Sequence, residues 1–136
     1  MKKIHTLAIV GSQRWLTTSG EIHAKFCLAA AVTFIEPTLL ISGGCPQGVD
    51  HWVEEEWLER STTPQLWQPG FSEYPAAVQE WDPPTKNGYK ARNIEIAEAC
   101  DALISIRSTT SKTYGSGWTA DYAEKLGKKV WRFEFS

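Results

Sequence analysis

Short apolar runs rich in strand-forming residues alternate along this chain with segments that have helical patterns. The runs lie at residues 6–11, 38–42, 64–68, 102–106 and 129–134, and the helical segments at 18–34, 49–60, 89–100 and between Gly117 and Leu126. Strands that are apolar on both faces and alternate with helices indicate a parallel sheet covered on each side. The sequence therefore predicts an α/β, Rossmann-like three-layer fold with a mostly parallel five-stranded sheet. A length of 136 residues fits one domain, residues 1–136.

Local signals predict where several of these elements begin and end. Thr18 and Glu21 form a capping-box pattern that opens the first helix, and Pro37 ends it. Gly127 is the expected C-cap of the last helix. The stretch 69–88 holds four prolines and two glycines and is predicted to be a loop.

Three of the strand-to-helix turns are rich in small residues. Right-handed crossovers place all such turns at one edge of the sheet, where folds of this kind bind ligands. Glycine lets backbone amides approach an anion, and the following helix adds the positive end of its dipole. The candidate ligand-binding residues in these turns are Gly11, Ser12, Arg14, Gly43, Gly44, Asp50, Gly115, Ser116, Gly117 and Thr119. The alternative is that each glycine only allows a tight turn.

Several side chains near these turns have chemistry that suits a phosphate-bearing ligand. Arg14 follows the first strand and is predicted to clamp a phosphate, whereas Arg92 and Asn93 form a polar pair at the start of a helix. Asp50 is predicted either to contact a ribose or a metal or simply to favour the helix dipole. Trp81, Tyr89 and Trp118 are candidates to stack on a base, with packing as the alternative. No convincing set of metal ligands occurs, and no cofactor is expected.

Absent motifs, net charge and cysteine content exclude several classes of function. The turns lack both the G-x-G-x-x-G dinucleotide fingerprint and the Gly-Lys-Ser/Thr of a P-loop. The formal net charge of −2 and the absence of a basic stripe argue against nucleic acid as a partner, and the apolar runs are too short for a membrane span. Three cysteines without metal spacing, Cys27, Cys45 and Cys100, indicate free thiols and a cytoplasmic location. For Cys45, packing is favoured over reactivity.

The order of the motifs resembles that of the SLOG superfamily, which groups the DNA-processing protein A and LONELY GUY families. The motifs are Gly11 to Arg14, Ser42 to Asp50, the Trp81 to Asn93 stretch and Gly115 to Asp121. The chain is most similar to the short, single-domain YspA-like members. The resemblance implies a Rossmann-like domain that binds a nucleotide or a nucleotide-derived ligand such as ADP-ribose, as a sensor or binding module. Relatives commonly dimerise through helices, so a homodimer is one option.

The resemblance also implies an enzymatic alternative. LONELY GUY enzymes hydrolyse a nucleoside monophosphate to a free base and ribose 5-phosphate. Arg92 matches their arginine and Thr119 their motif threonine, but Tyr122 replaces their glutamate, and Asp121 precedes it. Cleavage of an N-glycosidic bond needs a carboxylate near the sugar. Arg92 and Asp121 would therefore be the catalytic residues of an enzyme, and the tyrosine favours a binding module.

Overall fold

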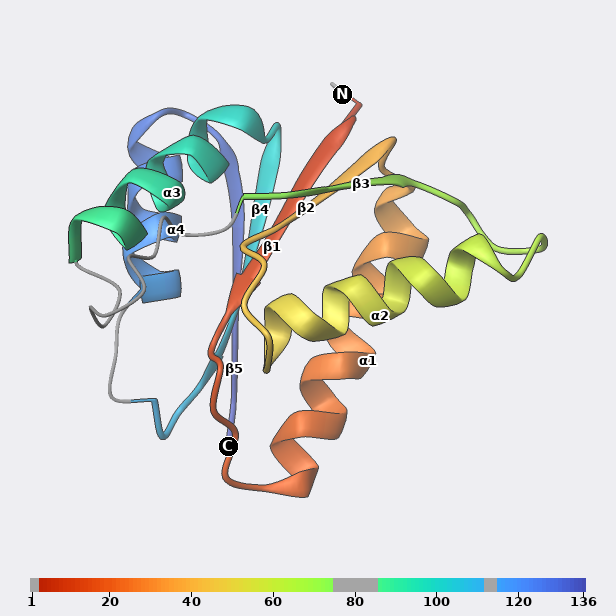
Figure 1. Ribbon diagram of the computed structural model, residues 1–136, viewed down its shortest axis with the longest axis horizontal. Helices are drawn as coiled ribbons and strands as arrows, with labels where there is room; N and C mark the ends of the chain where they lie inside the picture. Colours follow the sequence, from red (N-terminus) through yellow and green to blue (C-terminus); the bar gives the residue numbers. More distant parts are fainter. Residues whose placement is uncertain (1–2, 75–85, 112–114) are drawn as a thin grey trace.

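All five strands of the protein lie parallel in one sheet, in the order β3-β2-β1-β4-β5 (Figure 1). The computed structural model describes residues 3–74, 86–111 and 115–136, with side chains from residue 91 onward in the second range. The strands are β1 (Thr6–Gly11), β2 (Leu39–Ser42), β3 (Gly70–Glu73), β4 (Ala102–Ser108) and β5 (Lys129–Phe135). The helices are α1 (Thr18–Ile35), α2 (Val49–Ser61), α3 (Lys86–Ala99) and α4 (Gly115–Lys125). The predicted fold class is therefore confirmed.

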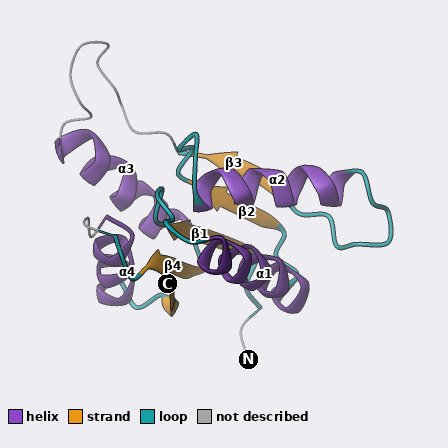
Figure 2. Cartoon of the chain, turned by 90° about the horizontal axis from the view of Figure 1, so that it is seen from below, coloured by secondary structure: helices purple, strands orange, loops and turns teal. Residues whose placement is uncertain are grey.

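Helices cover both faces of this sheet, α1 and α2 on one face and α3 and α4 on the other (Figures 1 and 2). The side chains of β1 pack against the helices on both faces of the sheet. Leu7 and Ile9 pack with the α1 and α2 residues, whereas Ala8 and Val10 pack with those of α3 and α4. Successive side chains of a strand point to opposite faces, so a strand buried on both sides is apolar throughout.

The third strand was predicted at the wrong residues. Residues 64–68 form turns and bends, and β3 lies a few residues later, where Gly70 pairs with Leu39 of β2. The indole of Trp67 instead donates a hydrogen bond to the Pro37 carbonyl, and Trp57 of α2 donates to the Pro69 carbonyl. These indoles fix residues 64–69 as a loop that leads into the edge of the sheet.

Smaller differences concern the ends of helices. The N-cap of α1 is Thr17 rather than Thr18, because the Thr17 side chain accepts a hydrogen bond from the Gly20 amide. Gly115 to Gly117 form the first turn of α4 instead of a loop before it. Gly127, with a φ of 83°, follows α4 as predicted. In the described part of the chain, no helix is long and apolar enough to cross a membrane.

Candidate functional site

The turns after β1 and β2 are joined at Ser12, which hydrogen-bonds to two other elements. Its amide donates to the Ile106 carbonyl, and its hydroxyl accepts from the Ser108 amide, both on β4. Its carbonyl accepts from the amide of Val49, the first residue of α2. Ser12 is nearly buried. The predicted ligand residue therefore ties β1, β4 and α2 together at the carboxyl edge of the sheet.

Two glycines make this close approach of the two turns feasible. A Cβ on Gly11 would lie 2.2 Å from the Ile106 carbonyl oxygen. Gly48 has a φ of 74°, and a Cβ there would lie 2.4 Å from the Ser12 carbonyl oxygen. Backbone packing alone accounts for glycine at these two positions.

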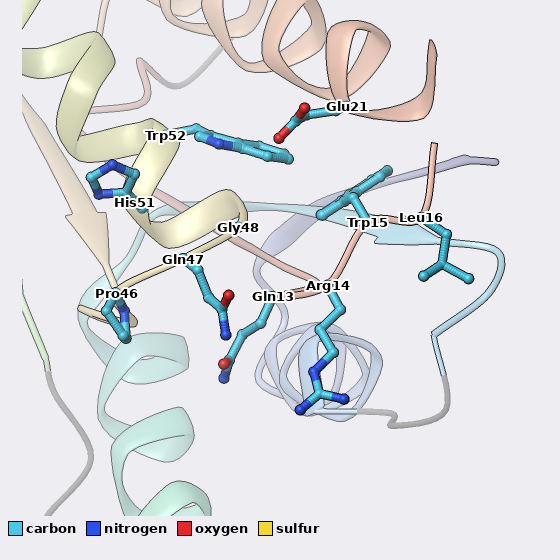
Figure 3. Close-up of a pocket in the computed structure, with 10 residues that line it drawn as sticks. All are labelled: Gln13, Arg14, Trp15, Leu16, Glu21, Pro46, Gln47, Gly48, His51 and Trp52. Carbon is cyan, nitrogen blue, oxygen red and sulfur yellow. The ribbon is translucent and has the colours of Figure 1, made fainter. Parts of the chain in front are cut away.

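A pocket of about 490 Å³ opens beside the joined turns (Figure 3). It is lined by Gln13, Arg14, Trp15, Leu16, Glu21, Pro46, Gln47, Gly48, His51 and Trp52. The side chains of Gln13, Arg14 and Gln47 extend in the same direction, whereas Trp15, Trp52 and Glu21 lie together on another side (Figure 3). The pocket thus combines a cation, two amides and an aromatic wall.

The aromatic wall is fixed by its own contacts. The Trp15 indole donates a hydrogen bond of 2.9 Å to the Ser12 carbonyl, and its ring centroid lies 5.6 Å from that of Trp52. The Nζ atom of Lys25 lies 5.2 Å from the Trp52 ring centroid. These interactions hold the indoles in place before any ligand arrives.

A second group of polar residues lies at the turn after β2 and is completed from the other face of the sheet. Arg92 of α3 donates through Nη1 to the Gly43 carbonyl at 2.6 Å and through Nε to the Asn93 side chain at 2.8 Å. Asp50 accepts a hydrogen bond from the Cys45 amide through Oδ2. A Cβ on Gly43 would lie 2.4 Å from Arg92 Nη1 and 2.7 Å from Asp50 Oδ2. The structure therefore brings Gly43, Asp50, Arg92 and Asn93 together.

Burial dominates the electrostatics of this group. Desolvation raises the pKa of Asp50, while hydrogen bonds from Cys45 and the charge of Arg92 oppose that rise. Burial, together with the nearby Asp50 carboxyl, raises the pKa of Cys45 to about 11. At neutral pH the Cys45 thiol stays protonated, which supports packing over reactivity. Gln13 of the pocket donates to the Cys45 sulfur at 3.3 Å, so the pocket and the polar group adjoin.

The residues predicted in the turn after β4 lie away from this pocket and this polar group. Thr119 is buried, and its hydroxyl donates to the Gly115 carbonyl within α4. Trp118 stacks on Tyr122, with ring centroids 5.5 Å apart. Asp121 accepts from Arg132 of β5 at 2.7 Å and lines a separate hollow of about 360 Å³ between α4, β4 and β5. Trp81 and the side chain of Tyr89 lie outside the described residues.

Sequence reasoning missed most of the pocket's lining. It singled out Arg14 but passed over Gln13, Gln47, Trp15 and Trp52. One signal was present, because Gln13 follows Gly11 at the start of the turn after β1, and Gln47 directly precedes Gly48 at the end of the turn after β2. Gly44, with a φ of 70°, donates its amide to the Ser42 hydroxyl. Gly44 thus shapes the turn whose later residues line the pocket.

No known protein family and no curated protein matches this chain by sequence. Solved structures do match its fold. DNA processing protein A from Streptococcus pneumoniae superposes with a TM-score of 0.67 at 18% identity, over 96% of this chain and 50% of that one. The Helicobacter pylori protein of the same name, described for its single-stranded DNA binding mode, gives 0.60 at 22% identity, over 94% and 64%.

A third similar structure is the molybdenum cofactor binding protein from Rippkaea orientalis. It superposes with a TM-score of 0.62 at 16% identity, over all of this chain and 79% of that one. The chain spans about half the length of the Streptococcus protein and about two thirds of the Helicobacter protein. The chain therefore shares the Rossmann-like fold of these three structures.

Proposed function

We propose that the carboxyl edge of the sheet binds a phosphate-bearing nucleotide or a nucleotide-derived ligand such as ADP-ribose, and that the protein acts as a sensor or binding module. The observation that carries the proposal is the pocket beside the joined turns, where Gln13, Arg14 and Gln47 extend to one side and Trp15 and Trp52 lie on another (Figure 3). The guanidinium, the amides and the indoles of this pocket are chemically complementary to the phosphate, the sugar and the base of a nucleotide.

Each part of such a ligand has a partner of suitable chemistry here. The Arg14 guanidinium suits a phosphate, with which arginine forms bidentate, charge-assisted hydrogen bonds. Gly48, His51 and Trp52 line the pocket from the first turn of α2, where the positive end of the helix dipole favours an anion. The amides of Gln13 and Gln47 can donate to and accept from a sugar or a base. The indole wall offers apolar surface to a base.

The binding role agrees better with the structure of the described residues than a catalytic role does. The Asp121 carboxylate is paired with Arg132 and faces the hollow beside β5, not the pocket beside the joined turns. A carboxylate that stabilises charge on a sugar must be aimed at that sugar. A small ligand also suits the net charge of −2 better than a nucleic-acid backbone does. We further propose a YspA-like subtype and a cytoplasmic location.

The test is calorimetric titration of the protein with AMP, GMP and ADP-ribose, with adenosine as the ligand that lacks phosphate. We expect the phosphate-bearing ligands to bind more tightly than adenosine. Arg14→Gln weakens their binding by at least about tenfold, because a hydrogen bond to a charged group is worth roughly 1.5–3 kcal/mol. Adenosine binding changes little in this variant.

Arg132→Gln is the matched control, because it removes an arginine of β5 that lies outside the pocket beside the joined turns. Its affinity for the same ligands is expected to equal that of the natural protein. Equal affinity for AMP and adenosine, or no binding of any of the four compounds, would overturn the proposed function.

A further inference from the structure

Glu21 is the one carboxylate among the described residues that line the pocket beside the joined turns. It stands in the first turn of α1, and its side chain lies with Trp15 and Trp52 on the same side of the pocket (Figure 3). Trp15 is the more accessible of the two indoles, because Trp52 is only 7% exposed. A base that enters the pocket therefore meets the Trp15 ring with a carboxylate close by.

The Glu21 carboxylate is not used to cap its own helix. In a capping box, the acidic residue stands three positions after the N-cap. The N-cap of α1 is Thr17, so that position belongs to Gly20, whose amide donates to the Thr17 hydroxyl. A Cβ on Gly20 would lie 2.2 Å from the Ser136 carbonyl oxygen, which excludes a glutamate there. Glu21 stands one position later, and its side chain lines the pocket instead.

The described cations of the protein also leave this carboxylate to a ligand. Lys25 stands four residues later, at the spacing of a helical ion pair, but its Nζ atom lies 5.2 Å from the Trp52 ring centroid. Arg14 extends in another direction from Glu21 (Figure 3). None of the ion pairs among the described residues includes Glu21. A partly buried carboxylate in this state favours a ligand that brings hydrogen-bond donors.

The nucleotide bases differ in the donors that they present to a carboxylate. An ionised carboxylate only accepts hydrogen bonds. The Watson–Crick edge of guanine has two adjacent donors, N1–H and the 2-amino group, so both carboxylate oxygens find a partner. Adenine has a single donor, its 6-amino group, beside the acceptor N1, which repels the second oxygen. A carboxylate beside a stacked base therefore discriminates in favour of guanine.

We propose that Glu21 makes the pocket selective for guanine nucleotides, by accepting hydrogen bonds from N1 and the 2-amino group of a base that packs on Trp15. This inference rests on the proposed function, because it keeps Arg14 as the partner of the phosphate. The pocket volume of about 490 Å³ lies within the range of roughly 300–1,000 Å³ that is usual for small-ligand sites. Adenine ligands such as AMP and ADP-ribose bind in the same pocket with lower affinity.

The experiment is calorimetric titration of the natural protein and of Glu21→Gln with GMP, IMP and AMP. The natural protein is expected to bind GMP at least about tenfold more tightly than AMP. IMP, which lacks the 2-amino group, is expected to fall between them. A glutamine amide both donates and accepts, which suits the adjacent donor and acceptor of adenine. Glu21→Gln is therefore expected to reverse the order of GMP and AMP, whereas damage to α1 would weaken both alike.

Glu59→Gln is the control, because it removes the same charge from an exposed residue near the end of α2, outside the pocket. It is expected to keep the natural preference for GMP. Equal affinity of the natural protein for GMP and AMP, or an equal loss for both in Glu21→Gln, would overturn the guanine selectivity and leave the proposed function standing. Failure of all three nucleotides to bind would overturn both.

Discussion

Asp50 is the residue at which burial and charge oppose each other most directly. The residue is 7% exposed, and its carboxyl accepts a hydrogen bond from the Cys45 amide. It lies close to Gly43, whose carbonyl accepts a hydrogen bond from Arg92. Desolvation is the largest influence on its pKa, which is raised above 3.8 despite the arginine. A carboxylate in this position is costly until a ligand or partner compensates it.

This balance predicts a pH dependence of stability. Because the pKa of Asp50 is higher in the folded protein, its favourable contribution is complete below 3.8 and is lost as the pH rises through the raised value. Asp50→Asn removes this titration. The free energy of unfolding of the natural protein minus that of Asp50→Asn, from urea titrations between about pH 3 and 7, should therefore fall as the pH rises. A difference that grows with pH would show that Arg92 and the Cys45 hydrogen bonds outweigh desolvation.

Gly48 gives a test of how tightly the two turns are joined. Gly48→Ala forces an L side chain into a φ of 74° and toward the Ser12 carbonyl. We expect a loss of about 1–3 kcal/mol in the free energy of unfolding. Gly115→Ala is the control, since a Cβ there meets nothing within 4 Å. Its stability should change by less than about 1 kcal/mol, and an equal loss in both variants would contradict the packing described for the turns.

At the scale of elements, sequence patterns predicted the strands that are buried on both faces and also β5 at one edge of the sheet, but they misplaced β3 at the other edge. β1 and β4 are apolar along nearly their whole length, so their positions were evident. β3 is an edge strand, Gly-Phe-Ser-Glu, with one apolar side chain and a single neighbouring strand. The strand was predicted at residues 64–68 instead, because Leu66 and Trp67 make that segment more apolar. Their location outside the sheet depends on tertiary hydrogen bonds that no local pattern reveals.

Arg60 of α2 links this helix to α1 through hydrogen bonds. Its guanidinium is almost wholly buried and donates to Glu56 at 2.8 Å, to the Ala29 and Trp67 carbonyls and to the Thr33 hydroxyl. Arg60→Met leaves the Glu56 carboxylate without its cation, so we expect a loss of about 3–5 kcal/mol in chemical denaturation. Lys125→Met, at the exposed end of α4, is the control and should lose less than about 1 kcal/mol. Similar losses in the two variants would argue against this link.

At the scale of the whole molecule, the parallel sheet determines which predicted site residues can meet. The carboxyl ends of β1 and β2 bring Ser12, Gly43 and Asp50 to one edge, and α3 adds Arg92 from the other face. The pattern of glycine-rich turns predicted that edge. It could not predict that Asp121 pairs with Arg132, because that contact depends on how α4 lies over β5.

The pairing of Asp121 with Arg132 predicts that the protein hydrolyses nucleoside monophosphates only slowly. Release of free base from nucleoside monophosphates, followed by chromatography, should stay far below about 1 per second, the lower end of ordinary enzyme turnover. Asp121→Asn should leave this low rate unchanged, since the carboxylate is paired with Arg132. Turnover at ordinary enzyme rates that collapses in Asp121→Asn would establish the hydrolase instead.

The central claim concerns where the ligand binds, and an amide NMR titration tests it most directly. ADP-ribose is added to ¹⁵N-labelled protein, and chemical-shift changes are compared with those caused by adenosine. The account predicts that the changes specific to ADP-ribose concentrate at Gln13 to Leu16 and Gln47 to Trp52, around the pocket beside the joined turns. Changes centred on the hollow of Arg107, Asp121 and Arg132, or none at all, would contradict it.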